Sequence, residues 1–202
     1  MKISQRLARW VMSSAGWTLT GELPPFGKAV FIAVPHTSNW DGIWFILYKF
    51  AIDVKVSFLA KHKLFWWPLG RFLSAIGAIP VDRNAAGGIV PQLIDEFERK
   101  ERLYLALAPE GTRAWQPYWK SGFYRIAKAA GVPIVLAYID YRKRALGIGP
   151  TLPDNQTLDQ DLETMRNFYA AVEGKRPDNQ GPIEFAPDDV EEIRRVMQGN
   201  AS

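Results

Sequence analysis

Apolar and polar residues follow two different periods along the chain, and these periods predict alternating strands and helices. Short apolar runs predict strands at residues 28–34, 54–60, 78–81, 103–108 and 134–140. Amphipathic segments of helical period predict helices at about residues 40–50, 88–100, 122–130, 158–173 and 187–198. This order is typical of an α/β fold, in which helices flank a central sheet that is mostly parallel or mixed.

An amphipathic helix is also predicted at the N-terminus, within residues 1–20. Its apolar face and the basic residues beside it are Ile3, Leu7, Trp10, Val11 and Trp17, with Lys2, Arg6 and Arg9. Such a helix either packs on the domain core or lies in a membrane interface, with tryptophan at headgroup depth and cations facing anionic lipid. The pattern favours neither interpretation over the other.

Positive charge is concentrated in the first three quarters of the chain. Residues 1–150 carry 20 Lys and Arg against 10 Asp and Glu, a net charge of +10, whereas residues 151–202 carry 5 against 11, a net charge of −6. We expect one domain of 202 residues, with an α/β core at 28–141 and an acidic C-terminal extension at 150–202. The basic body predicts an anionic partner, which is nucleic acid, membrane phosphate or a small phosphorylated substrate.

The sequence contains no cysteine, and it shows neither a membrane-spanning run nor a signal peptide pattern. The chain has no cysteine, which excludes disulfides, thiolate metal sites and a cysteine acyl-enzyme. No apolar run reaches the roughly 18–20 residues of a membrane span, and the N-terminus lacks the pattern of a signal peptide. These features predict a cytoplasmic protein.

The first candidate for chemistry is the stretch V-P-H-T-S-N-W-D-G at residues 34–42. His36 and Asp41 would diverge on a regular helix, so they meet only if the residues between them form a turn. A neutral imidazole oriented by a carboxylate can act as a general base near neutral pH. Taken alone, the spacing favours the alternative, a turn whose His and Asp merely cap a helix.

Two further segments can bind an anion. In A-P-E-G-T-R at residues 108–113, Gly111 permits a tight turn, Thr112 adds a hydroxyl donor and Arg113 offers a planar fork suited to phosphate. In I-P-V-D-R at residues 79–83, Arg83 follows a short apolar segment. An ordinary surface turn and a surface ion pair are the alternatives for the two segments.

The order and spacing of these blocks resemble the glycerolipid acyltransferase family, typified by lysophosphatidic acid acyltransferases. The matching blocks are P-H-T-S-N-W-D, G-A-I-P-V-D-R, P-E-G-T-R and V-P-I-V-L-A-Y, within residues 35–138. The chain is most similar to a small bacterial branch with H-T-S-N-W-D, since Pro35 replaces the asparagine frequent before the histidine. Leu136 stands where the fourth block often has a second proline.

The resemblance implies a glycerol-3-phosphate acyltransferase-like fold and transfer of a fatty acyl group from acyl-CoA or acyl carrier protein to a hydroxyl. His36 would be the general base and Asp41 would orient it, which makes residues 28–141 the catalytic core. The acceptor site would be formed by the basic and turn residues of the second and third blocks, Arg83, Glu110, Gly111, Thr112 and Arg113. Glu110 is expected to position Arg113 or a substrate hydroxyl.

The resemblance requires no cofactor and no metal, and His62, the only other histidine, is not part of a metal-binding motif. The expected partners are the thioester donor, a lysolipid or other hydroxyl acceptor, and a membrane surface on the inner face of the cell membrane, but not nucleic acid. Lyso-aminolipid and glycerol phosphate are alternative acceptors. A non-catalytic binder of anionic lipid or nucleic acid is the rival from another class.

Overall fold

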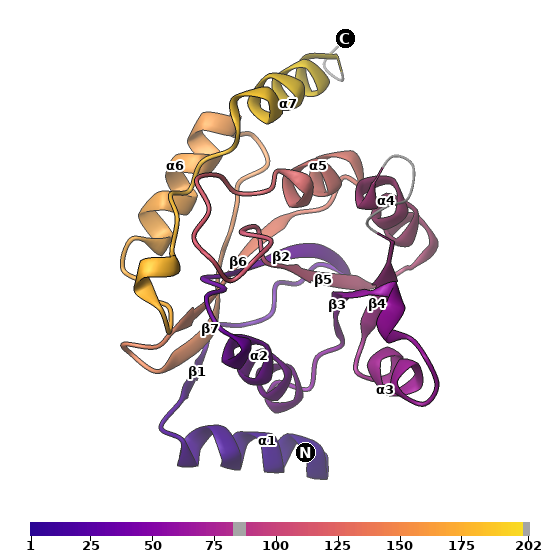
Figure 1. Ribbon diagram of the computed structural model, residues 1–202, viewed down its shortest axis with the longest axis vertical. Coiled ribbons are helices and arrows are strands. Elements are labelled where there is room, and N and C mark those ends of the chain that lie inside the picture. Colours follow the sequence, from indigo (N-terminus) through magenta and orange to yellow (C-terminus); the bar gives the residue numbers. More distant parts are fainter. Residues whose placement is uncertain (83–87, 200–202) are drawn as a thin grey trace.

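Within residues 1–82 and 88–199, which are those that the computed structural model describes, seven strands form one sheet (Figure 1). The order across the sheet is β1-β7-β6-β2-β5-β3-β4. The strands are β1 Thr18–Thr20, β2 Lys28–Val34, β3 Val56–Lys61, β4 Ala78–Val81, β5 Leu103–Leu107, β6 Ile134–Asp140 and β7 Ala145–Thr151.

The sheet is mixed, as predicted. β2 lies at its centre and pairs in parallel with β5 on one side and β6 on the other, so that Val30 is opposite both Leu105 and Ile134. The pairs β1–β7, β3–β5 and β3–β4 are also parallel, and β6 and β7 form an antiparallel pair. A parallel strand needs a crossover connection, and helices supply these connections here.

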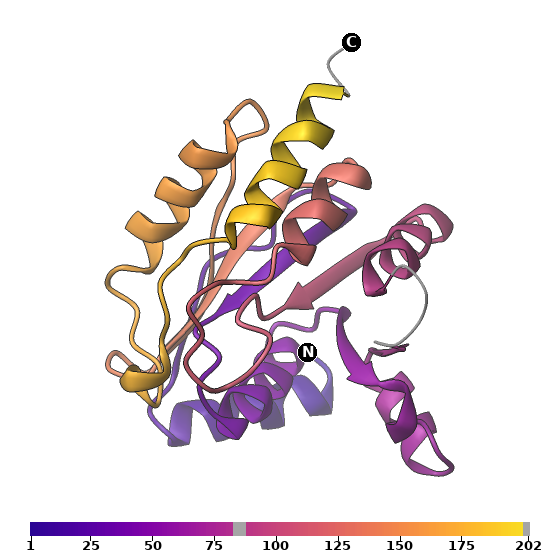
Figure 2. The ribbon, with the colours of Figure 1, turned by 45° about the horizontal axis from the view of Figure 1, so that its top comes forward.

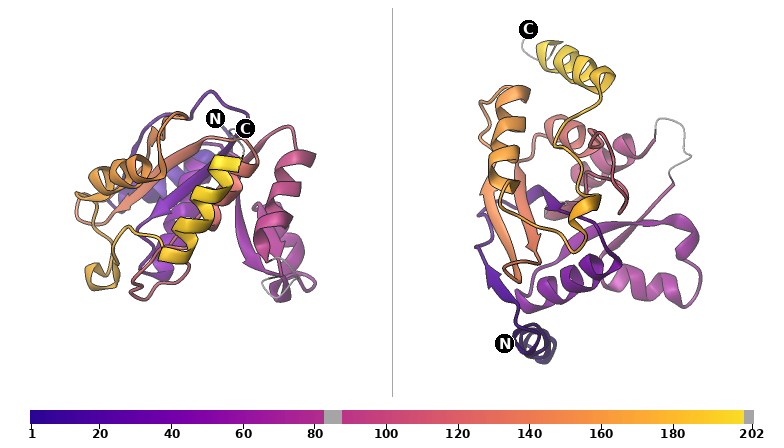
Figure 3. Two further views of the ribbon diagram at one scale, coloured as in Figure 1. Left: turned by 90° about the horizontal axis from the view of Figure 1, so that it is seen from above. Right: turned by 60° about the vertical axis from the view of Figure 1, so that its left-hand side comes forward.

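Helices cover both faces of the sheet (Figure 1 and Figure 2). The α-helices are α1 Ile3–Ser14, α2 Asn39–Ala51, α3 Leu69–Ala75, α4 Ile89–Arg99, α5 Gly122–Ala129, α6 Leu158–Tyr169 and α7 Pro187–Gly199, and two 3-10 helices are η1 His62–Leu64 and η2 Pro177–Asn179. α4, α5, α6 and α7 lie on one side, whereas α1 and α2 lie on the other (Figure 3).

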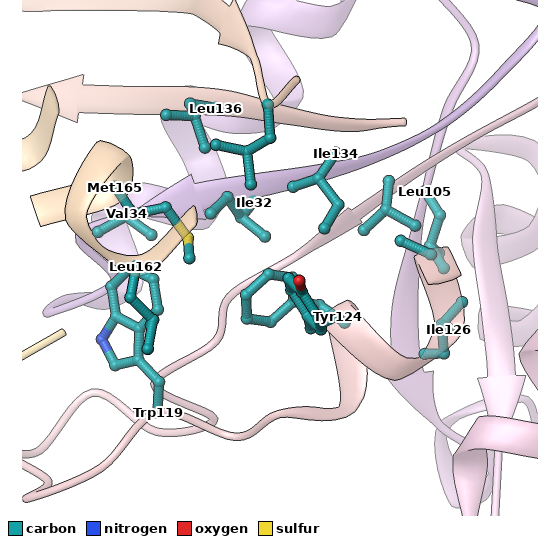
Figure 4. Close-up of a cluster of buried hydrophobic side chains, with 14 of the residues drawn as sticks. Ile32, Val34, Leu105, Trp119, Tyr124, Ile126, Ile134, Leu136, Leu162 and Met165 are labelled. Carbon is teal, nitrogen blue, oxygen red and sulfur yellow. The ribbon is translucent and has the colours of Figure 1, made fainter. Parts of the chain in front are cut away.

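The larger core lies between the sheet and the α4–α7 side. Ile32 of β2, Leu105 of β5 and Leu136 of β6 point into it and meet Tyr124 of α5 and Met165 of α6 (Figure 4). Because successive side chains of a strand point to opposite faces, the neighbours of these residues face α2 instead. Burial on both faces explains why β2 is a continuous apolar run.

Three elements were not predicted from the sequence: β1, β7 and α3. β7 reads A-L-G-I-G-P-T, and its two glycines and proline have low strand propensity. It forms because antiparallel pairing with β6, from Val135 to Asp140, satisfies its backbone in the sheet. The N-terminal helix lies within the predicted residues 1–20 and ends at Ser14, so that Trp17 lies after it in the core and not on its apolar face.

The acidic C-terminal part packs on the same core as the β-sheet. Leu162 and Met165 of α6 and Ile193 of α7 belong to the larger core cluster, and Arg194 of α7 pairs with Asp159 of α6 at 2.9 Å. Between these two helices, η2 and its flanking residues return to the edge of the sheet where β2 ends. This return brings residues 173–180 close to His36, as described below.

Candidate active site

The candidate residues gather at one edge of the sheet. His36 follows β2, Glu110 follows β5, and Tyr141 follows β6. Because these three strands are adjacent and parallel, their carboxyl ends lie side by side. The carboxyl ends of parallel strands are where open α/β sheets place their binding sites.

His36 and Asp41 are brought together by the turn that begins α2. Ser38 is the N-cap, and its side chain accepts a hydrogen bond from the Trp40 N–H at 3.3 Å. Asp41 completes a capping box: its Oδ2 accepts the N–H groups of Ser38 at 2.7 Å and Thr37 at 2.8 Å. The carboxylate therefore folds back towards the residues before the helix, and its Oδ2 lies 3.2 Å from Nδ1 of His36.

Asp41 is an ionised carboxylate at neutral pH. Burial alone would raise its pKa, but hydrogen bonds from His36, the Tyr141 hydroxyl and the Ser38 amide outweigh burial and hold the pKa below its usual value. The Tyr141 hydroxyl donates to Oδ1 at 2.7 Å. With Nδ1–H of His36 directed at this anion, Nε2 carries the lone pair that can accept a proton.

Replacing Tyr141 by Phe should make the protein less resistant to acid. The hydrogen bond from Tyr141 lowers the pKa of Asp41, so that pKa should rise when the hydroxyl is removed. A carboxylate whose folded-state pKa is depressed contributes stability that is present above its unfolded-state pKa and lost as the pH falls through the folded-state pKa. Thermal unfolding between roughly pH 5 and pH 2 should show this loss at a higher pH in the variant. If the variant and the wild type lose stability at the same low pH, the hydrogen bond from Tyr141 does not lower the pKa of Asp41.

Glu110 ties the end of β5 to the end of β2. Its Oε1 accepts the backbone N–H of His36 at 2.9 Å, and its side chain is buried. Burial raises the pKa of this carboxyl. Glu110 contacts the backbone of the candidate base, whereas the sequence analysis expected it to position Arg113 or a substrate hydroxyl. It therefore holds His36 in place from the main chain.

The turn after Glu110 offers backbone donors. Gly111 has a φ of 68°, in the left-handed region, and its N–H donates to the Ala108 carbonyl at 3.1 Å. In the described part of the chain, the N–H groups of Thr112 and Arg113 have no hydrogen-bond acceptor. These two amides, rather than that of Gly111, are available to a ligand.

Arg113 reaches the beginning of α2. Its guanidinium donates to Oδ1 of Asn39, and its own carbonyl accepts the side-chain amide of Asn179 at 2.8 Å. The structure thus places Arg113 beside the block that holds His36 and Asp41. Arg83, the other arginine predicted for the acceptor site, lies outside the described residues.

A cavity of about 660 Å³ opens beside the His36–Asp41 pair. It is lined by α2 from Asp41 to Lys49, by Gly111 after β5, by the face of the sheet that α2 covers, and by residues of α4 and α5 such as Ile89 and Ile126. Most of its lining is apolar. Its volume lies within the roughly 300–1,000 Å³ common for ligand sites. An imidazole and a carboxylate on the wall of an apolar cavity fit a reaction on a hydroxyl next to a hydrocarbon chain.

A family model described as Acyltransferase matches residues 6–140, about two thirds of the chain. The chain belongs to the acyltransferase family. The crystal structure of the 1-acyl-sn-glycerophosphate (LPA) acyltransferase PlsC from Thermotoga maritima is similar in fold, with a TM-score of 0.56. The two are 14% identical, and the match covers 82% of this chain and 74% of that one. No curated protein matches the chain. The resemblance inferred from the sequence motifs is confirmed at the level of the family.

Three residues of this acyltransferase's site were missed by the sequence analysis. Tyr141 contacts Asp41, Lys120 lines the cavity next to Gly111, and Lys49 lines it further along α2. Their roles depend on contacts between strands and helices distant in sequence. A tyrosine just after a buried strand, at the edge where His36 also lies, is the one signal that could have indicated Tyr141.

Lys49 is a buried cation in an apolar setting. Its ammonium donates to the Val56 carbonyl at 2.7 Å and also to the Ile76 carbonyl, and it lies 5.7 Å from the centre of the Phe58 ring. Burial lowers the pKa of Lys49 to about 8. Because α2 rises about 1.5 Å per residue, Lys49 lies about 12 Å along the helix from Asp41.

Within residues 1–82 and 88–199, no three His, Cys, Asp or Glu side chains are arranged to hold a metal ion. None of the helices in the same part of the chain combines the length and the apolar character needed to cross a bilayer.

Proposed function

We propose that this acyltransferase moves a fatty acyl group from a thioester donor, acyl-CoA or acyl carrier protein, to a hydroxyl of a lysophospholipid-like acceptor. The observation that carries the proposal is the His36–Asp41 pair at the opening of an apolar cavity. Membership of the acyltransferase family supports acyl transfer in general. The lysophospholipid-like acceptor is suggested by the similar fold of an LPA acyltransferase.

In the proposed mechanism, Nε2 of His36 removes the proton of the acceptor hydroxyl as its oxygen attacks the thioester carbonyl. Asp41 stabilises the imidazolium that forms. The tetrahedral intermediate collapses, the carbon–sulfur bond breaks, and the leaving thiolate takes the proton from His36. The products are the ester and the free thiol, and no acyl-enzyme forms.

The oxyanion of the intermediate requires hydrogen-bond donors. The N–H groups of Thr112 and Arg113 are proposed for this role, because they have no acceptor in the described part of the chain. Each donor of an oxyanion hole is commonly worth about 2.7–4 kcal/mol. Lys120, which lines the cavity beside Gly111, supplies positive charge to the same corner.

The cavity beneath α2 is proposed to hold the acyl chain, and Lys49 to limit the chain length. Replacing Lys49 by Met should shift the preferred donor to longer chains, because a flexible thioether can yield to a hydrocarbon end whereas an ammonium bonded to two carbonyls cannot. Turnover with a series of acyl thioesters of increasing length measures this effect. Lys55→Met, at an exposed lysine after α2, is the matched control. An identical length profile in the Lys49 variant would rule out this role.

A membrane-facing surface is proposed on the side of α1, α2 and α3. Trp10 on α1, Ile43 on α2, and Trp66 and Phe72 next to or within α3 are exposed apolar side chains. Lys and Arg residues accompany them in the sequence, as expected at an interface with anionic lipid. Trp17, which was also assigned to this surface, is buried and packs against Trp44. Such a surface fits a peripheral position on the inner face of the cell membrane.

The test of the proposed function is a matrix of purified protein with radiolabelled acyl-CoA or acyl carrier protein thioesters and several acceptors. The acceptors are lysophospholipids, glycerol phosphate and lyso-aminolipids. We expect an acylated product with at least one lysophospholipid. Release of free fatty acid alone would identify a thioester hydrolase instead.

A further inference from the structure

The segment that joins α6 to α7 lies against the block that contains the candidate base (Figure 3). We call residues 173–180 the strap. The carbonyl of Glu173 accepts the backbone N–H of Tyr141 at 2.8 Å, and the backbone N–H of Arg176 donates to Oγ1 of Thr37 at 3.2 Å. Asn179 donates to the carbonyl of Arg113 at 2.8 Å. The strap therefore contacts the three corners that follow β2, β5 and β6.

The strap has a defined shape at its closest approach. Gly174 lies so near Thr37 that an added Cβ would be 2.8 Å from its Oγ1, and 3.0 Å from Cγ of Pro35. The N–H of Gly174 donates to Oε1 of Gln180 at 2.8 Å, which closes the strap on itself. These contacts fix the two basic residues that follow Gly174 along the chain.

These basic residues place positive charge beside the catalytic block. Lys175 holds its ammonium 4.7 Å from the centre of the Trp40 ring, in the first turn of α2, and Arg176 is anchored to Thr37 through its backbone. Both side chains are exposed. Arg113 contacts Asn39 in the same turn, so the side chains of Lys175 and Arg113 and the backbone of Arg176 all lie beside the start of α2.

No carboxylate of the described residues neutralises the charge of these three side chains. In residues 1–82 and 88–199, Lys175, Arg176 and Arg113 form no ion pair with a carboxylate. The acids of the strap are Glu173 and Asp178, and neither pairs with them.

We propose that Lys175 and Arg176 of the strap, together with Arg113, form a subsite for a phosphate group of a substrate. Guanidinium groups match phosphate with two parallel hydrogen bonds, and a lysine adds a point charge. This inference rests on the proposed function for its choice of substrates. Arg113 lies within residues 6–140, the part that the family model matches, whereas Lys175 and Arg176 lie outside it and are contributed by the C-terminal part of this chain.

The phosphate can come from the acyl acceptor or from the acyl-CoA donor, and steady-state kinetics separates the two sources. We expect the double variant Lys175→Ala, Arg176→Ala to raise one KM about tenfold, with kcat nearly unchanged, because charged hydrogen bonds are lost at an exposed site. A higher KM for 1-acylglycerol 3-phosphate, but not for monoacylglycerol, assigns the subsite to the acceptor. A higher KM for acyl-CoA assigns it to the donor. If the variant had the same KM as the wild type for both the acceptor and acyl-CoA, the subsite would be overturned.

Two matched variants separate charge from structure. Lys55→Ala with Arg102→Ala removes two exposed cations from the opposite edge of the sheet, where β3 and β5 begin, and should leave both KM values unchanged. Lys175→Arg with Arg176→Lys keeps the charge and should retain most of the wild-type affinity. If this charge-conserving variant had a KM as high as that of the double alanine variant, the loss of charge would not be the cause of the higher KM. The subsite would then be rejected.

Calorimetric binding of a short-chain 1-acylglycerol 3-phosphate and of CoA requires no turnover. If wild type binds either ligand and the double alanine variant binds it about tenfold more weakly, the subsite stands even when no acylated product forms. In that case the proposed function fails and the phosphate subsite does not. Equal binding of both ligands by the wild type and the variant overturns the subsite, whatever the activity.

Discussion

Replacement of His36 by Ala is expected to lower kcat by about 10²–10⁴-fold, the usual contribution of a general base. The fold should persist, because the bond that holds this corner runs from the backbone N–H of His36 to Glu110 and does not involve the imidazole. The ring is also partly exposed, at 31%. Single-turnover acyl transfer from a labelled thioester measures the effect.

His62→Ala is the matched control, since it removes the other histidine, which lies in η1 between two lysines. We expect wild-type kcat in this variant. Acceptor binding by His36→Ala should also remain close to wild type, because the base acts on the proton and not on the headgroup. Wild-type turnover in His36→Ala would refute direct general-base transfer and would favour a non-catalytic or differently catalysed role for the cavity.

The second large effect is expected from Asp41→Asn, which removes the charge of the carboxylate and keeps its shape. The amide oxygen can still accept the N–H groups of Thr37 and Ser38, and the amide nitrogen can face the Tyr141 hydroxyl. The α2 cap should therefore survive. The imidazolium of His36, however, loses its counter-charge, and kcat should fall roughly 10²–10⁴-fold.

Kinetics of the combined variant test whether the two residues act as a unit. Members of one catalytic pair are strongly non-additive, so His36→Ala with Asp41→Asn should be no slower than His36→Ala alone. Thermal unfolding at neutral pH provides the control for the cap. If the two reductions in kcat multiplied in the double variant, Asp41 would act independently of His36, and the proposed orienting role would be wrong.

The sequence was informative where local patterns carry the information. The apolar runs of β2, β5 and β6 and the capping residues of α2 depend on neighbours in the chain, and these elements appear within one or two residues of their predicted bounds. β7 could not be predicted, because its glycines and proline oppose a strand and only its pairing with β6 and β1 overcomes them.

In the candidate site, too, some residues could be identified from local sequence patterns and others only from long-range contacts. His36, Asp41 and the Glu-Gly-Thr-Arg corner could be selected from motifs, because each lies in a short block whose residue types suit the chemistry. Tyr141, Lys49 and Lys120 could not, because their relation to the site arises from strand order and from the packing of α2. Glu110 contacts the backbone of His36, and not Arg113 as expected from the sequence.

By itself, the sequence determined the α/β class and the family and indicated His36 and Asp41 as the candidate pair, since these follow from hydrophobic period and from residue types at short spacing. Only the tertiary structure decided that β6, β2 and β5 end side by side and that the cavity runs along α2 to the buried Lys49. It also decided that the strap, in the acidic C-terminal part, contacts Thr37. The reason is physical: strand order and long-range contacts depend on how whole faces of the sheet are buried, and no local segment of the chain contains that information.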